Sequence, residues 1–274
     1  MLGKLIKHDF IGSSHSMLVV YLVAFISFAV TALSYLFNIK FLKFIGSFTS
    51  VIIVVGLVLI TTIIMMKYFN KSLYSDQGYL SYTLPVKSKD ILLSKAIVSF
   101  VWLTISYLIL VGTVVGTIWY AKAKLGESLG ADFDEIIDMF SMMMQGGGLP
   151  TAAAIAKIIA AALIYGFITI LVLIAEVFFS MTLSNVKPFN KLGFFGGILI
   201  FVAVYIVIQI LSALVMVYFP ISLFVSGDGI KIAFKSMNNV SNTFGIGGLI
   251  LQVILSIGMF FATNNLMSKK INLR

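Results

Sequence analysis

The chain has 274 residues, of which 60% are hydrophobic and 11% are charged, and its mean hydropathy is +1.10. A soluble domain averages about 45–50% apolar and about 25% charged residues, so the composition excludes a cytosolic enzyme and a disordered tail. Cysteine is absent, which excludes disulfides and thiolate metal sites. The net charge is +9, but all the basic residues except Arg274 are Lys, whereas base and phosphate recognition favours Arg. Nucleic acid is therefore not expected as a partner.

The first sixteen residues predict a helix lying in the membrane interface. Apolar side chains share one helical face and basic side chains the other: Leu2, Leu5, Ile6 and Phe10 on the first, Lys4, Lys7 and His8 on the second. This pattern is typical of helices in the headgroup plane. Asp9 intrudes on the apolar side. A frayed leader with anchoring lysines is the alternative.

Six apolar stretches are long enough to cross a bilayer as helices, which needs about 20 residues each. They are residues 17–37, 44–66, 96–120, 158–182, 192–219 and 244–267. Helices satisfy their own backbone hydrogen bonds in lipid, so we expect an all-α membrane protein, one transmembrane domain over residues 1–274. With both termini in the cytoplasm, twelve of the nineteen basic residues fall on the inner side. Basic residues are enriched in cytoplasmic loops, which favours this N-in/C-in topology.

The segment 67–95, between the second and third spans, is the most informative on partners. Ser75 can cap a short helix from Asp76, and Pro85 ends it because the residue before proline is pushed out of helical geometry. Ser88 can cap the helix that continues into the third span. The short helix carries an exposed cluster that favours docking against another protein: Tyr79, Leu80 and Tyr82. A solvated connector with interface-anchoring tyrosines is the alternative.

Two further segments lie on the predicted outer side. Acidic residues at 127–138 alternate with apolar ones at helical spacing, which predicts an acidic amphipathic helix. Its acids lack the ligand spacing of a calcium loop and are expected to be solvated, with attraction of cationic cargo as the alternative. The semi-apolar segment 219–243, broken by Pro220, Gly227 and Gly229, is expected to dip back into the outer leaflet.

Glu176 is the acidic residue deep within a predicted span. An intramembrane carboxylate is costly and is a functional candidate by default. It could be the proton or cation site of a secondary transporter. A structural or coupling role is the alternative, because Glu176 lies within about two turns of the inner end of its helix. The chain has no G-x-x-x-x-G-K-[ST] phosphate loop and so is not expected to hydrolyse ATP by that route.

Over its whole length the chain resembles the type 2 permeases of bacterial ABC exporters. The resemblance rests on the basic N-terminal segment 4–10, the six spans, and the run S-D-Q-G-Y-L-S-Y-T-L-P at 75–85, followed by I-L-L-S-K at 91–95. This run looks like that of permeases encoded beside an ATP-binding subunit in low-GC Gram-positive bacteria. In such exporters this loop carries a coupling helix that docks in a groove of the ATPase. The resemblance implies these coupling residues: Asp76, Gly78, Tyr79, Leu80, Tyr82, Leu84 and Pro85.

The compact six-span form is similar to exporters of phenol-soluble modulins and to lantibiotic immunity transporters. That similarity implies amphipathic, antimicrobial or toxin-like peptides or lipid-like molecules as cargo, and a place in the bacterial cytoplasmic membrane. The implied partners are an ATPase subunit that binds ATP and Mg, a second permease protomer, identical or homologous, and membrane lipid. The chain itself is expected to hold no cofactor. Segment 219–243 resembles the re-entrant outer helices of the family. An ion-coupled transporter using Glu176 and a non-transporting membrane sensor are the alternatives.

Overall fold

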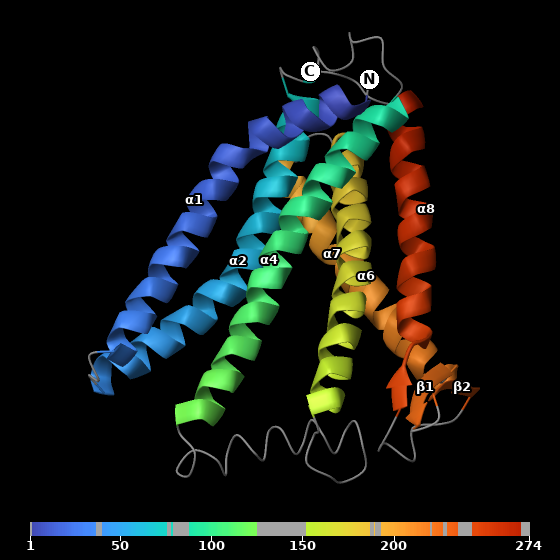
Figure 1. Cartoon of the computed structure of the whole chain (residues 1–274). Coiled ribbons are helices and arrows are strands. Elements are labelled where there is room, and N and C mark those ends of the chain that lie inside the picture. Colours follow the sequence, from blue (N-terminus) through green and yellow to red (C-terminus); the bar gives the residue numbers. More distant parts are fainter. Residues whose placement is uncertain are drawn as a thin grey trace. The chain divides into compact units, whose positions relative to one another are not determined.

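The structure, a computed structural model (Figure 1), describes residues 2–36, 40–75, 78, 88–124, 152–186, 189, 193–219, 221–226, 229–234 and 243–269. This part of the chain forms helices α1 (Leu2–Leu36), α2 (Lys40–Tyr74), α4 (Ser88–Lys124), α6 (Ala152–Ser184), α7 (Gly193–Tyr218) and α8 (Gly247–Lys269). Three strands lie between the last two helices: β1 (Ile221–Ser226), β2 (Gly229–Phe234) and β3 (Thr243–Gly245). The acidic segment 127–138 lies outside the described residues.

Within the described residues, five helices are long and apolar enough to cross a membrane, over Leu2–Val30, Ser88–Thr113, Leu163–Ser184, Gly193–Tyr218 and Gly247–Ser268. Large apolar side chains on them are exposed, among them Phe195 at 77%, as suits helices solvated by lipid. The chain is therefore a multi-pass membrane protein. The remaining predicted span, 44–66, lies within the 35-residue helix α2, whose side chains are described only in part. Six crossings and the N-in/C-in topology stay predictions.

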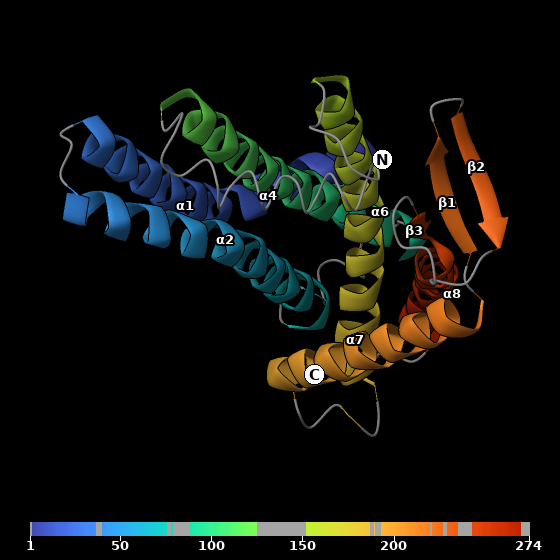
Figure 2. The ribbon, with the colours of Figure 1, turned by 90° about the horizontal axis from the view of Figure 1, so that it is seen from below.

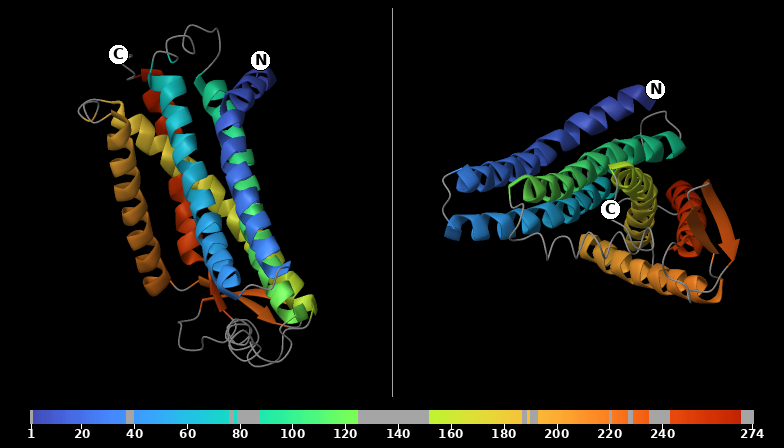
Figure 3. Two further views of the ribbon diagram at one scale, coloured as in Figure 1. Left: turned by 90° about the vertical axis from the view of Figure 1, so that its left-hand side faces the viewer. Right: turned by 60° about the horizontal axis from the view of Figure 1, so that its bottom comes forward.

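Helix α1 is continuous from Leu2 to Leu36, so the expected interfacial segment and the first span are one helix. Figure 3 shows that its first turns run at an angle to the rest. Ser13 Oγ donates to the carbonyl of Asp9 at 2.9 Å, and Ser14 Oγ donates to that of Ile11 at 2.8 Å. Such back-bonding and Gly/Ser pairs bend helices, so Ser13 and Ser14 provide a local cause for a change of direction near the start of α1.

The segment between α7 and α8 holds three strands, which the all-α expectation did not include, and its dip into the outer leaflet stays a prediction. β1 pairs antiparallel with β2, with Ile221 opposite Phe234 and Ser226 opposite Gly229, and β3 pairs with the other side of β1. The strand sequences ISLFVS and GIKIAF are rich in β-branched and aromatic residues, and Gly-Asp separates them, which favours a hairpin. The all-helical expectation therefore fits the spans and not this short segment.

The chain divides into two compact units. The first comprises Met1–Val115, Val177–Ile200 and Phe260–Arg274, and the second comprises Gly116–Glu176 and Phe201–Met259. Within the second unit, a Cβ added to Gly248 of α8 would lie 3.2 Å from the carbonyl oxygen of Ser212. The backbones of α7 and α8 therefore approach closely there, as small residues allow in membrane helices.

The first unit holds α1, α2 and the first part of α4 side by side (Figure 2). A buried cluster joins these three helices: Met17, Met65, Val98 and Trp102. The start of α1, the end of α2, the start of α4 and the end of α6 lie at the same end of this unit (Figure 1). That end flanks the segment that the sequence singles out for docking.

Candidate functional site

The end of α2 leads into the predicted coupling segment through a tight turn. Ser75, expected to cap a short helix from Asp76, donates its hydroxyl to the carbonyl of Lys71 in α2, and its capping role stays a prediction. The amide of Gly78 donates to the carbonyl of Ser75 at 2.7 Å. Gly78 is buried, and a Cβ there would collide with the carbonyl oxygen of Leu73. The turn therefore requires glycine at this position.

Gly78 is the predicted coupling residue that the structure describes. The others lie outside the described residues, and their roles stay predictions: Asp76, Tyr79, Leu80, Tyr82, Leu84 and Pro85. The helix ends on both sides of this segment are described, and each of them is anchored.

The end of α2 is anchored to the last turns of α6. The rings of Phe69 and Phe178 stack with their centroids 4.1 Å apart and their planes at 11°. The hydroxyls of Tyr74 and Thr182 lie 2.8 Å apart, and the amide of Asn185, just after α6, donates to the side-chain oxygen of Asn70 at 3.0 Å. Both phenylalanines are 1% exposed. Stacked aromatic pairs add to the stabilisation from burial, so the end of α2 is firmly held.

The start of α4 is anchored to α1 by a buried ion pair. Lys95 Nζ lies 3.0 Å from Asp9 Oδ1, and the two residues are 5% and 6% exposed. Ser94 Oγ donates to Asp9 Oδ2 at 2.7 Å, and Tyr68 of α2 donates its hydroxyl to Asp9 Oδ1 at 3.1 Å. We call Asp9, Tyr68, Ser94 and Lys95 the Asp9 cluster. It joins three helices through one carboxylate.

The electrostatics of the Asp9 cluster explain why it persists when buried. Removing two charges from water is costly, and the attraction between them offsets this only if hydrogen bonds also satisfy the charged atoms. Asp9 accepts three such bonds, and Lys95 Nζ also lies 5.3 Å from the centroid of the Tyr68 ring, a cation–π distance. Burial, and then the negative charge of Asp9, raises the pKa of Tyr68, so its phenol keeps the proton that it donates.

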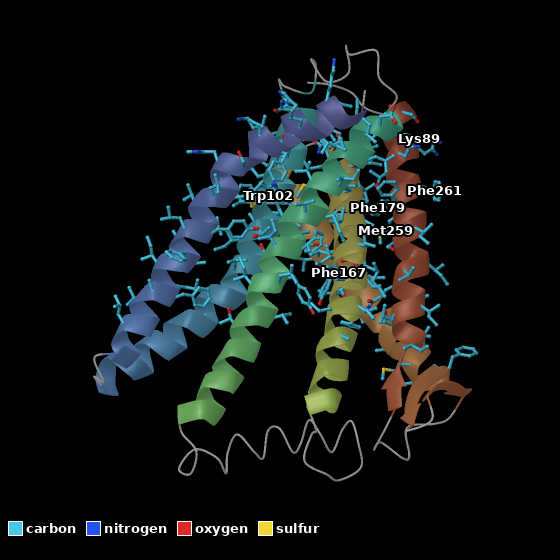
Figure 4. All side chains as sticks on the ribbon, viewed as in Figure 1. Lys89, Trp102, Phe167, Phe179, Met259 and Phe261 are labelled. Carbon is cyan, nitrogen blue, oxygen red and sulfur yellow. The ribbon has the colours of Figure 1, made fainter. Side chains whose placement is uncertain are left out.

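A chain of hydrogen bonds continues from the Asp9 cluster along the same three helices. Trp102 Nε1 donates to Ser13 Oγ at 2.9 Å, and Tyr21 donates its hydroxyl to the carbonyl of Trp102 at 2.9 Å. Tyr21 and Thr61 then each lie within 3.0 Å of Ser106 Oγ. Figure 4 shows Trp102 between α1 and α4. Because interhelical hydrogen bonds hold helices together in lipid, these contacts join α1, α2 and α4 along their length.

Glu176 lies in α6 and is 3% exposed. It stands eight residues before Ser184, where α6 ends, a rise of about 12 Å. Within the described residues no group of three or more histidines and acids is placed to hold a metal ion. The role of Glu176, in ion transport or in structure and coupling, stays a prediction.

The Asp9 cluster is the feature that sequence reasoning missed. The sequence shows Asp9 as a polar residue on an apolar face, but Lys95 enters the sequence argument only as one of the basic residues that indicate topology and as part of the run at 91–95. A signal was present on α4, because Lys95 falls in line with buried Ile91, Val98 and Trp102 at helical spacing. A lysine in an apolar stripe needs a buried partner.

A scan against protein-family models, a search of curated proteins and a search of solved structures each found no match. No activity can therefore be carried over from a matched relative. The residues and contacts described above are what bears on function.

Proposed function

We propose that the chain is the permease subunit of an ATP-driven exporter in a bacterial cytoplasmic membrane. It would work with separate ATPase subunits and with a second permease protomer. The observation that carries the proposal is the anchoring of both helix ends that flank residues 76–87. Tyr74, at the end of α2, bonds to Thr182, and Lys95, near the start of α4, pairs with Asp9. Because both helix ends are anchored, a displacement of residues 76–87 would be transmitted to the neighbouring helices, α6 and α1.

The mechanism follows from that anchoring. ATP binding in the partner moves residues 76–87, and the displaced ends of α2 and α4 move α6 and α1. A conformational change of this kind needs a partner with different affinities for the two states, which the ATP-bound and ATP-free ATPase supply. The 13 Met and 24 Phe of the chain suit amphipathic peptides, because such surfaces repack around varied partners.

Co-expression with the ATP-binding subunit encoded beside this chain tests the proposal. The unaltered chain is expected to co-purify with that subunit, and Tyr79→Ala and Leu80→Asp to lower the affinity about tenfold or more, as loss of an interface anchor does. Phe261→Ala is the matched control, because Phe261 is 66% exposed and points away from α8 (Figure 4). Absence of a complex with the unaltered chain would refute the proposal.

An ion-coupled secondary transporter is a second candidate, favoured by the burial of Glu176 within an apolar helix. Buried carboxylates in spans form the proton and cation sites of many transporters. The two candidates differ in energy source. In proteoliposomes with a pH gradient and no ATP, an ion-coupled transporter moves solute and an exporter permease does not. A sensor would bind a partner through residues 76–87 and move no solute under either condition.

A further inference from the structure

The first turns of α1 form an arm that polar and aromatic contacts hold against α2 and α4. We define the arm as residues 2–11, which precede Gly12 and the back-bonded Ser13 and Ser14, and its basic side chains, Lys4 and Lys7, are exposed. Asp9 and Phe10 tie the arm to α4: Asp9 pairs with Lys95 and accepts a hydrogen bond from Ser94 at 2.7 Å, and Phe10 stacks on Trp102 with centroids 4.7 Å apart. The arm also contacts α2, because Tyr68 donates its hydroxyl to Asp9 Oδ1 at 3.1 Å.

The ion pair of Asp9 and Lys95 lies at the first turns of α4, which follow residues 76–87 and would be displaced with them. Ser94 and Lys95 follow the first residue of α4, Ser88, by less than two turns, and both side chains reach Asp9. A displacement of these turns therefore acts on α1 through the carboxylate of Asp9. Ser94 and Lys95 donate to different oxygens of this carboxylate, so α4 is joined to α1 at two points.

We propose that Asp9 and Lys95 are positioning residues of the exporter, which hold the arm of α1 on α4 and carry the movement of the first turns of α4 to α1. The inference rests on the proposed function for its second half only. Loss of the pair is expected to free the arm and to uncouple ATP hydrolysis from transport. Binding of the ATPase stays intact, because the predicted docking residues are unchanged.

The position of the arm can be measured without any partner. The chain has no cysteine, so spin labels can be placed at Lys4→Cys and Lys71→Cys, two exposed sites on α1 and α2. With Asp9 and Lys95 unaltered, the distance between the two labels is expected to have a narrow distribution. With Asp9→Asn or Lys95→Met, this distribution is expected to broaden. Exchange of the charges, Asp9→Lys with Lys95→Asp, is expected to narrow it again. Labels at Lys67→Cys and Lys89→Cys, on α2 and α4, are the control and should stay unchanged.

The neutral double variant, Asp9→Asn with Lys95→Met, covers the case in which a lone buried charge prevents folding. It carries no unpaired charge and should still broaden the distance from Lys4 to Lys71. An unbroadened distribution in this variant and in every single variant that folds overturns the inference, whatever the partner does.

The second part of the inference, that the ion pair carries movement from α4 to α1, is tested in lipid discs and vesicles with the ATPase bound. For Asp9→Asn, the ratio of cargo moved to ATP hydrolysed is expected to fall about fivefold or more, the range of ordinary coupling between sites. The KM for ATP and the amount of bound ATPase should not change, whereas a merely structural role would lower assembly. If the arm is loosened and the ratio is unchanged, the positioning role is refuted. If the unaltered chain binds no ATPase, the proposed function and the transmission of movement by the ion pair are both refuted. The distances between the labels still decide whether Asp9 and Lys95 hold the arm on α4.

Discussion

At the scale of a single residue, position 78 requires glycine, because a side chain there would collide with the carbonyl of Leu73. Gly78→Ala is expected to lower stability by about 1–3 kcal/mol, the usual cost of overpacking. Thermal unfolding of the purified chain in detergent measures the change. Gly112→Ala is the control: nothing lies within 4 Å of a Cβ there, and alanine in a helix should raise stability by about 0.5–1 kcal/mol. Equal shifts for the two variants would contradict the collision.

Trp102 provides a second test among the buried polar contacts. Trp102→Phe keeps a ring to stack on Phe10 but removes the N–H that donates to Ser13. A net loss of about 1 kcal/mol is expected, the ordinary worth of one hydrogen bond. Ser13→Ala leaves the indole N–H buried without that acceptor, and should cost at least as much. In a double-mutant cycle the two losses should not add. Additive losses would show that the 2.9 Å contact contributes nothing.

The sequence could identify some of these residues but could not pair them. Asp9 disturbs an apolar face and Glu176 interrupts a span, so both are recognisable from local pattern alone. The partner of Asp9 lies 86 residues away. No local pattern indicates which helix packs on which, because lipid-facing and buried faces are equally apolar. The collision at Gly78 is likewise a property of the folded turn, even though the glycine itself is visible in the run at 75–85.

At the scale of the element, hydropathy predicts where helices lie but not where they end. Helix α4 begins at Ser88, eight residues before its predicted apolar stretch, because the helix also includes polar residues such as Lys89 and Asp90. The helix starts at the serine that the sequence offers as its cap, Ser88. The sheet between α7 and α8 escaped prediction, although β1 and β2 are rich in β-branched and aromatic residues. Strand length and the Gly-Asp pair between β1 and β2 were the available signals.

The stack of Phe69 on Phe178 makes the junction of α2 with α6 testable as an element. Phe178→Ala is expected to cost about 3 kcal/mol, since it leaves a cavity in a buried aromatic pair. Unfolding in detergent, followed by circular dichroism, measures the loss. Phe261→Ala is the matched control and should change stability little, because Phe261 is 66% exposed. Comparable losses for both would mean that the stack does not hold the end of α2.

At the scale of the whole molecule, composition decides the class and a few polar contacts decide the arrangement. The apolar spans would be satisfied by many packings in lipid, because one apolar face replaces another at little cost. Polar groups remove that freedom, since each must meet a partner. The Asp9 cluster and the bond from Tyr74 to Thr182 therefore specify how α1, α2, α4 and the end of α6 meet. Single-sequence reasoning supplies the helices but not these pairings.

Glu176 decides between the two energy sources for the whole molecule. Glu176→Gln keeps the shape of the side chain and removes its charge. With the ATPase bound, ATP-driven export is expected to stay within about twofold of the unaltered chain, because a push through residues 76–87 needs no titrating group in α6. Glu176→Ala, which adds a cavity, separates loss of packing from loss of charge. The measurement is uptake of a labelled amphipathic peptide into inside-out vesicles, with ATP or with a pH gradient alone. Uptake driven by the gradient in the unaltered chain and abolished by Glu176→Gln would assign the transport to the carboxylate and not to the anchored segment.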